Sequence, residues 1–146
     1  MHSLSSVLLV EDNADDADLI AYAFDKAGIA NPLLTFADGE AAIDFVEGRP
    51  PYDDRSRHPL PGLILLDLKL PRQSGFEVLR AVRANLLARH TPVVVLTSSN
   101  QDSDIRRAYE LYANSYLVKP VSRETLLGMV RTLDAYWIRL NRAVRA

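Results

Sequence analysis

Short, uninterrupted runs of apolar residues recur along the chain, and they predict the strands of a parallel sheet. Strands that are apolar on both faces are typical of sheets covered by helices on both sides. The predicted strands span residues 5–10, 33–36, 62–66, 92–96 and 115–118.

Between these runs, apolar residues recur every three or four positions, as they do along the buried face of a helix. Asn13 has the side chain of a helix N-cap, Asp16 follows in the capping-box position, and Gly28 marks the end of this first helix. Asp38 is expected to cap the second helix. Three more helices are predicted over residues 75–88, 102–112 and 122–142. Strands that alternate with helices predict an α/β sandwich with right-handed crossovers.

Residues 48–61 form a long polar segment with four prolines between the second helix and the third strand. A connection of this length is either functional or mobile. Elsewhere the sequence contains no repeat, linker or low-complexity tract, and 146 residues suit one domain with a full core. We therefore expect a single domain over residues 1–146.

Polar residues whose side chains could bind a ligand or take part in a reaction stand where four of the apolar runs end. They are Glu11, Asp12, Asp67, Thr97 and Lys119. In a parallel sheet the ligand site lies outside the carboxyl ends of the strands, so we expect these side chains to meet at one edge. Carboxylates so close together are unfavourable unless a cation lies between them. Because the expected ligands are oxygens, with no histidine or cysteine cluster, the hard cation Mg²⁺ is favoured.

A carboxylate, a magnesium ion and an ammonium group around one pocket are typical of phosphoryl transfer. Aspartate carboxylates can accept phosphate covalently, and Asp67 is the best candidate because a loop rather than a helix cap follows it. Lys119 supplies a compact positive charge for a phosphoryl oxygen, and Thr97 supplies a hydroxyl donor.

Four motifs, each at the end of its own strand, make the chain similar to the receiver domain of bacterial two-component response regulators over residues 6–138. They are Leu9-Val10-Glu11-Asp12-Asn13, the D-x-x-x-P-x-x-x-G pattern from Asp67 through Pro71 to Gly75, Thr97-Ser98-Ser99, and Tyr116-Leu117-Val118-Lys119-Pro120. The long loop before the third strand and the absence of an output domain most resemble the stand-alone receivers partnered with phytochrome-type histidine kinases.

The resemblance implies a flavodoxin-like (βα)5 doubly wound three-layer sandwich with a parallel five-stranded sheet of order 2-1-3-4-5. It implies a protein that is not an enzyme but a phosphoacceptor that supports its own phosphorylation and dephosphorylation. A sensor histidine kinase would phosphorylate Asp67, and the product would signal through protein–protein contacts.

The resemblance also implies roles for single residues. The metal ligands would be Asp12, Asp67 and the backbone carbonyl of Lys69, with Glu11 acting through water. Lys119 would pair with phosphoryl oxygens, through a Lys119–Pro120 bond expected to be cis. Thr97 and Tyr116 would form the switch, with the hydroxyl moving towards phosphate and the ring rotating inward.

Two residues depart from the family pattern. Lys69 places a long cation at the mouth of the pocket, where a shorter polar side chain is common. Tyr112 stands where a glycine usually ends the fourth helix, so a positive φ there would carry strain on the order of 1 kcal/mol.

Other functions remain as alternatives. A haloacid-dehalogenase-like phosphatase would need a D-x-D motif after the first strand, and a flavodoxin-like redox carrier would need a hydroxyl-rich phosphate loop there. Glu11-Asp12-Asn13-Ala14 supplies neither. A receiver-like interaction module that is never phosphorylated stays open.

The composition narrows the classes of function further. The chain has no cysteine, which excludes disulfides and thiolate metal sites. No apolar run approaches the roughly 18 residues of a membrane span, so we expect no membrane contact and a cytoplasmic location. A net charge of −2, with nothing after the last helix that could serve as a recognition helix, gives no support to nucleic-acid binding.

The last predicted helix carries an apolar stripe at Leu126, Val130, Leu133, Trp137 and Leu140. This stripe should face the sheet at least through Leu133, while Leu127, Tyr136 and Ile138 lie off it. The excess of apolar side chains favours a symmetric homodimer through strand 115–118 and the last helix. The alternative is a monomer whose helical tail folds back on its own core.

Overall fold

Five parallel strands form one sheet in the order β2-β1-β3-β4-β5, which confirms the predicted fold. The computed structural model describes residues 4–144 of the chain. The strands are β1 (Val7–Val10), β2 (Leu33–Phe36), β3 (Leu63–Leu66), β4 (Val93–Thr97) and β5 (Ser115–Val118). β1, β3 and β4 are buried along their whole length, because helices cover both of their faces.

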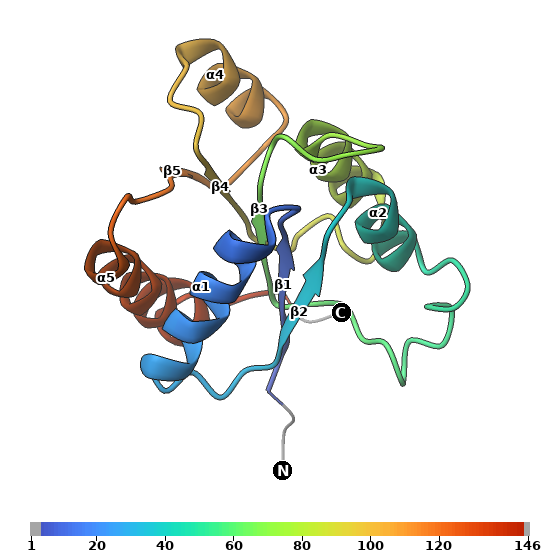
Figure 1. Ribbon diagram of the computed structural model, residues 1–146. Helices are drawn as coiled ribbons and strands as arrows, with labels where there is room; N and C mark the ends of the chain where they lie inside the picture. The colour runs from blue at the N-terminus through green and yellow to red at the C-terminus, as the bar shows by residue number, and fades with distance from the viewer. Residues whose placement is uncertain (1–3, 145–146) are drawn as a thin grey trace.

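Helices lie on both faces of the sheet (Figure 1). The helices are α1 (Ala14–Lys26), α2 (Gly39–Glu47), α3 (Gly75–Ala84), α4 (Asp102–Glu110) and α5 (Arg123–Leu133). α1 and α5 pack together over one core, which contains Ile20, Phe24 and Val130. α2 and α3 pack together over the other core, to which α4 contributes Ala108.

The two predicted helix caps, Asn13 and Asp38, are formed, and Ser74 and Ser122 cap two further helices. Each of these side chains accepts a hydrogen bond from a backbone N–H in the first turn of the helix that follows. Gly28 has a φ of 72° and follows the last turn of α1. These caps fix where each helix starts and so hold the loops at the carboxyl edge of the sheet.

The segment 48–61 packs against the fold. The ring of Tyr52 lies edge-on to those of Phe36 and Phe45, with centroids 5.8 Å and 5.2 Å away. Arg55 donates to the carbonyls of Val46 at 2.6 Å and His58 at 3.2 Å. Aromatic packing and backbone hydrogen bonds therefore position this long connection beside β2 and α2.

The turn between α4 and β5 has the positive φ that would strain a non-glycine residue. Tyr112 has a φ of 69°, a conformation that costs a non-glycine residue on the order of 1 kcal/mol. Arg83 on α3 holds this turn, because its guanidinium donates twice to the Tyr112 carbonyl, at 3.0 and 2.8 Å, and once to Asn114 Oδ1 at 2.9 Å. The contact from α3 therefore fixes the C-terminal end of α4.

The last helix changes its period. α5 continues directly into a π-helix, η1 (Asp134–Leu140), in which residues five apart are hydrogen-bonded. Asp134 is buried, and its carboxylate accepts from Arg139 five residues later at 3.0 Å.

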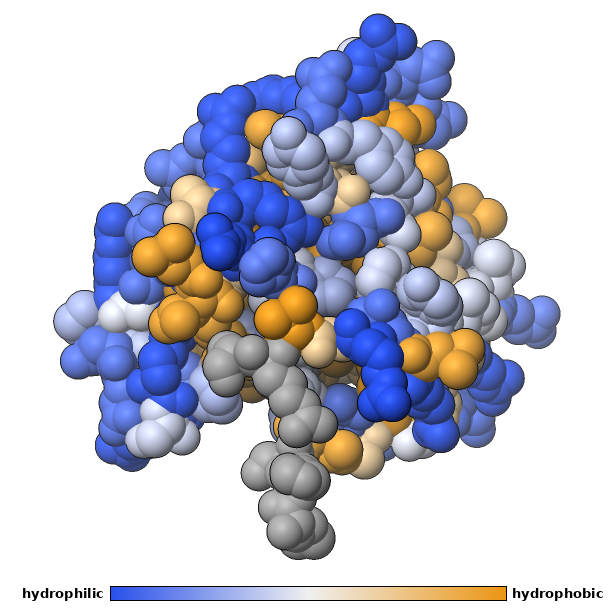
Figure 2. Space-filling view, turned by 180° about the vertical axis from the view of Figure 1, so that it is seen from behind, coloured by the Kyte–Doolittle hydropathy of each residue, from blue (hydrophilic) through white to orange (hydrophobic). Residues whose placement is uncertain are grey.

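This change of period limits the predicted stripe. Leu126, Val130 and Leu133 are buried as expected, but Leu140 is 71% exposed because the wider turn rotates it away from the core. Seen from behind, apolar residues reach the surface as separate patches among hydrophilic ones (Figure 2). Among the described residues, no helix has both the length and the apolar character needed to cross a membrane.

Candidate functional site

Asp67 lies directly after the central strand β3, and its carboxyl group is nearly buried. One oxygen, Oδ1, accepts from the backbone N–H of Leu68 at 2.7 Å and of Lys69 at 3.4 Å. The other oxygen, Oδ2, accepts from the ammonium group of Lys119 at 2.9 Å. The two oxygens are therefore not equivalent, because the backbone orients one and a side chain orients the other.

The loop after Asp67 is held by close backbone contacts at two glycines. A Cβ atom on Gly75 would lie 2.1 Å from the carbonyl oxygen of Asp67, and one on Gly39 would lie 1.9 Å from that of Gln73. The N–H of Gly75 donates to Leu68 O at 2.9 Å. The glycine of the D-x-x-x-P-x-x-x-G pattern is thus required for the close approach of α3 to the loop.

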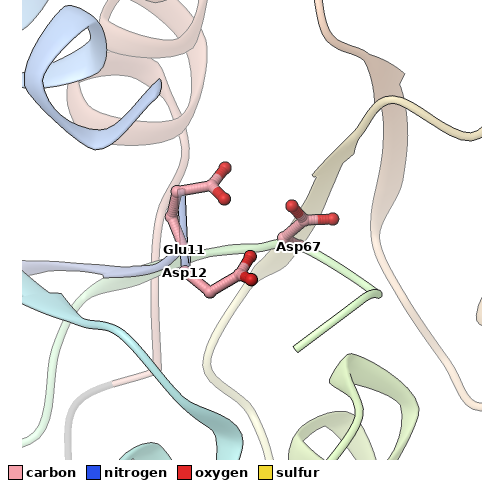
Figure 3. A group of neighbouring side chains, drawn as sticks. All are labelled: Glu11, Asp12 and Asp67. Atoms are coloured by element: carbon pink, nitrogen blue, oxygen red, sulfur yellow. The ribbon is translucent and has the colours of Figure 1, made fainter. Parts of the chain in front are cut away.

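Three carboxyl groups meet at the ends of β1 and β3 (Figure 3). Glu11, Asp12 and Asp67 each offer an oxygen, and these oxygens lie within 4.8 Å of one another. Asp12 is exposed, whereas Glu11 is buried and accepts from the N–H of Asn13 at 3.1 Å through Oε2. A set of carboxylate oxygens at this spacing fits a hard divalent cation.

Lys119 lies among the carboxylates. Its ammonium group is 2.5 Å from Glu11 Oε1, 2.9 Å from Asp16 Oδ2 and 2.9 Å from Asp67 Oδ2. The backbone N–H of Lys119 donates to Thr97 O at 2.8 Å, and this hydrogen bond holds the backbone of Lys119 beside the end of β4. The expected cis bond at Lys119–Pro120 was wrong: among the described residues the cis peptide bond is Pro50–Pro51, and trans is the usual state of an X–Pro bond.

Burial and the ammonium group act in opposite directions on the carboxyl groups. Burial raises the pKa of Glu11 to about 7, against the lowering effect of its hydrogen bond with Lys119. Burial also acts to raise the pKa of Asp67, but the hydrogen bond from Lys119 and the nearby Thr97 hydroxyl lower it overall. Burial alone would lower the pKa of Lys119, yet its hydrogen bonds to Glu11, Asp67 and Asp16 raise it. The ammonium is therefore the permanent charge of the site.

Thr97 and Tyr116 lie behind the carboxyl cluster. The Thr97 hydroxyl is fully buried at the end of β4 and has no hydrogen-bond partner of ordinary geometry among the described residues. Tyr116 on β5 is partly buried, and its hydroxyl donates to the Ser99 carbonyl at 2.9 Å. The Ser99 hydroxyl in turn donates to Asp104 on α4 at 2.6 Å. A chain of contacts thus joins β5 to the first turn of α4.

A family model, the response regulator receiver domain, matches residues 7–131. The chain belongs to this family. It is 42% identical over 137 residues to the probable methanogenesis regulatory protein FilR2 of Methanothrix harundinacea, covering 94% of this chain and 86% of that protein. It is 37% identical over 132 residues to the response regulator Rcp1 of Synechocystis, covering 90% of this chain and 88% of that protein.

Solved structures of receivers resemble this one closely. The phosphorylated cyanobacterial phytochrome response regulator RcpA superposes with a TM-score of 0.91 at 30% identity, over 98% of this chain and 100% of that one. The Mn²⁺-bound form of Rcp1 superposes with a TM-score of 0.87 at 35% identity, over 97% of this chain and 99% of that one. Rcp1 therefore binds a divalent cation, and the similar receiver domain of the sensor histidine kinase PA1611 from Pseudomonas aeruginosa coordinates a magnesium ion in its active-site cleft.

In this receiver the predicted site residues lie together at the carboxyl edge of the sheet. One residue that was not predicted to belong to the site joins them. Glu11, Asp12, Asp67 and Lys119 form the pocket, and the Lys69 side chain is exposed beside it. The addition is Asp16, whose carboxylate was interpreted from sequence as part of a capping box. Its spacing from Asn13 fits that motif, and nothing in the sequence signals a partner 103 residues away.

Replacing Glu11 by glutamine should change how the stability of this receiver depends on pH. Because folding raises the pKa of Glu11 from 4.5 to about 7, its contribution to stability is fully present below pH 4.5 and is lost as pH rises through 7. In metal-free buffer the loss should be at most roughly 3 kcal/mol of unfolding free energy. Glu11→Gln should remove this part of the slope.

Urea unfolding with a chelator present, at several pH values between about 5 and 8, measures the effect. Glu110→Gln, which changes an exposed acid on α4, is the control and should keep the wild-type slope. Parallel curves for wild type and Glu11→Gln would show that burial does not raise the Glu11 pKa.

Proposed function

We propose that this protein is a response regulator that accepts a phosphoryl group on Asp67 from a sensor histidine kinase, in a reaction that depends on Mg²⁺. The observation that carries the proposal is the pairing of Asp67 Oδ2 with the Lys119 ammonium, beside two further carboxyl groups. Family membership and the fold support it, as does the cluster of carboxylate oxygens of Glu11, Asp12 and Asp67.

In the proposed reaction, an oxygen of Asp67 attacks the phosphorus of a phosphohistidine. A P–O bond forms, the P–N bond breaks, and its electron pair stays on the histidine nitrogen, which takes up a proton from solvent. Lys119 would neutralise charge on the phosphoryl oxygens. Asp12, Asp67 and the Lys69 carbonyl would hold Mg²⁺, with Glu11 acting through water. When bound, the ion supplies further positive charge against the transferring group.

The names of two relatives support a phytochrome-type kinase as the phosphodonor. RcpA is a phytochrome response regulator by name, and its structure covers all but a small part of this chain. A bacteriophytochrome response regulator, AtBRR, is 38% identical over 97% of this chain. In this function the protein is a phosphoacceptor rather than an enzyme with a separate substrate, and it signals through protein contacts.

Phosphorylation of Asp67 is the first test. Incubation with Mg²⁺ and acetyl phosphate should add one phosphoryl group to the intact mass. Asp67→Asn should abolish the adduct because the amide oxygen is a poor nucleophile, and chelation of the metal should do the same. Asp53→Asn, on the exposed segment 48–61, is the control and should react like wild type. An adduct that survives Asp67→Asn would refute the assignment, and a wild type that never reacts would favour the phosphorylation-independent module.

We also propose that Thr97 and Tyr116 form a two-state switch. A phosphoryl group would give the unpaired Thr97 hydroxyl an acceptor, and its movement would change the space available to the Tyr116 ring. The bond from Tyr116 to Ser99, and from Ser99 to Asp104, supports transmission to α4.

Thr97→Ala should separate chemistry from switching. The variant should still bind beryllofluoride at Asp67 but lose the amide chemical-shift changes on α4, β5 and α5. Thr97→Ser keeps the hydroxyl and should respond like wild type, which makes it the matched control. Equal shift changes in the alanine variant and wild type would rule out the coupling.

We further propose a symmetric homodimer through β5 and the last helix. Exposed apolar side chains on these elements support it: Val118 on β5, and Tyr136 and Leu140 on η1. A two-fold axis would pair each patch with its own copy and remove these groups from water.

Charge on this patch should prevent association. Tyr136→Asp/Leu140→Asp replaces two exposed side chains, so the fold should be kept while self-association is lost. Leu86→Asp/Leu87→Asp, which changes two exposed leucines after α3, is the control and should associate like wild type. Sedimentation at tens of micromolar, with and without beryllofluoride, decides the question. A monomeric wild type under both conditions eliminates the dimer.

A further inference from the structure

The first turn of α1 is capped in a way that frees the Asp16 carboxylate. In a capping box the side chain at this position would accept from the backbone N–H of the N-cap residue. Here Asn13 Oδ1 accepts from the Asp16 N–H at 3.0 Å, but the Asn13 N–H donates to Glu11 Oε2 at 3.1 Å instead. Because Glu11 satisfies the cap, Asp16 reaches across to Lys119 at 2.9 Å.

The geometry of an ammonium group makes this contact informative. A lysine ammonium has three N–H bonds and no acceptor. Glu11, Asp16 and Asp67 supply three carboxylate oxygens to it, and they come from the end of β1, from α1 and from the end of β3. The ammonium donates to Asp16 Oδ2 and Asp67 Oδ2, and these two hydrogen bonds together with the ion pair to Glu11 set the position of its nitrogen beside Asp67.

We infer that Asp16 is a positioning residue for phosphoryl transfer to Asp67, acting through Lys119. The inference rests on the proposed function of Asp67. The Asp16 side chain is 39% exposed, so solvent screens its charge, and its main effect on the ammonium is directional rather than Coulombic. Glu11 alone would leave the flexible Lys119 side chain free to swing about one contact, because a single contact does not fix the position of the ammonium nitrogen.

Loss of Asp16 should therefore lower the rate of the chemical step without changing donor binding. Misplacement of a group that meets the transition state costs up to 10²-fold in rate, and part of that loss is expected because Glu11 still contacts Lys119. For Asp16→Ala we expect about a tenfold lower maximal rate of phosphorylation by phosphoramidate. The half-saturating concentration of phosphoramidate should be unchanged.

Two variants make the comparison specific. Asp16→Asn keeps an acceptor oxygen at the same distance from the backbone and should recover most of the rate. Asp15→Ala is the matched control. Asp15 is an exposed acid in the same first turn of α1, so its substitution removes the same charge as Asp16→Ala does. It should react at the wild-type rate. Urea unfolding of all variants separates effects on folding from effects on Lys119.

A second measurement does not depend on the reaction. The ¹H–¹⁵N signal of a lysine ammonium is seen when hydrogen bonds and burial slow the exchange of its protons with water. Lys119 should give this signal in wild type, Asp15→Ala and Asp16→Asn, and should lose it in Asp16→Ala.

The outcomes are distinct. Asp16→Ala protein that reacts as fast as wild type or faster, or that keeps the Lys119 signal, would overturn the inference. A rate that Asp16→Asn fails to recover would also overturn it, because charge rather than direction would then be the cause. A wild type that forms no adduct refutes the proposed function instead.

Discussion

The ammonium group of Lys119 lies between three carboxylates, two of which are buried, and the rest of the carboxyl edge depends on that contact. Buried like charges repel and lose hydration, so neither Glu11 nor Asp67 could stay ionised there without a cation. Lys119 follows β5, whereas its partners follow β1 and β3 or lie on α1. One side chain therefore joins four elements, and the site is part of what holds this edge of the fold together.

The sequence predicted the alternating strands and helices, the caps at Asn13 and Asp38 and the residues of the pocket, because each has a local signal. The sheet order, in contrast, was implied by the resemblance to receiver domains. Apolar runs mark strands, and N-cap side chains mark helix starts. Features that depend on distant partners had no such signal. Asp16 fits a capping box equally well on local spacing, and only its contact with Lys119 decides its role. The π-helix, in which Arg139 donates to Asp134, likewise has no local signal, and its sequence predicts a continued α-helix.

The pocket has a firmly held side. Gly39 and Gly75 let the loop after Asp67 pack directly against backbone, so movement of that loop would need movement of α2 and α3. Arg72, in the same loop, has a φ of 71°, a conformation that persists only where surrounding contacts determine it. The Asp67 carboxylate is thus held in place by the fold, which would limit the reorganisation that the proposed phosphoryl transfer requires.

The opposite side is held less firmly. Ala108 is the buried residue of α4, and the N-cap position of that helix, Gln101, makes no side-chain cap bond. Few buried contacts mean a low free energy for local movement, whereas Arg83 fixes the far end of the helix. A change at Thr97 that reaches α4 through Ser99 would therefore move its first turn more readily than its last. The fold thus holds Asp67 firmly after β3 and leaves α4, which follows β4, freer to move, and the proposed phosphorylation switch would need both properties.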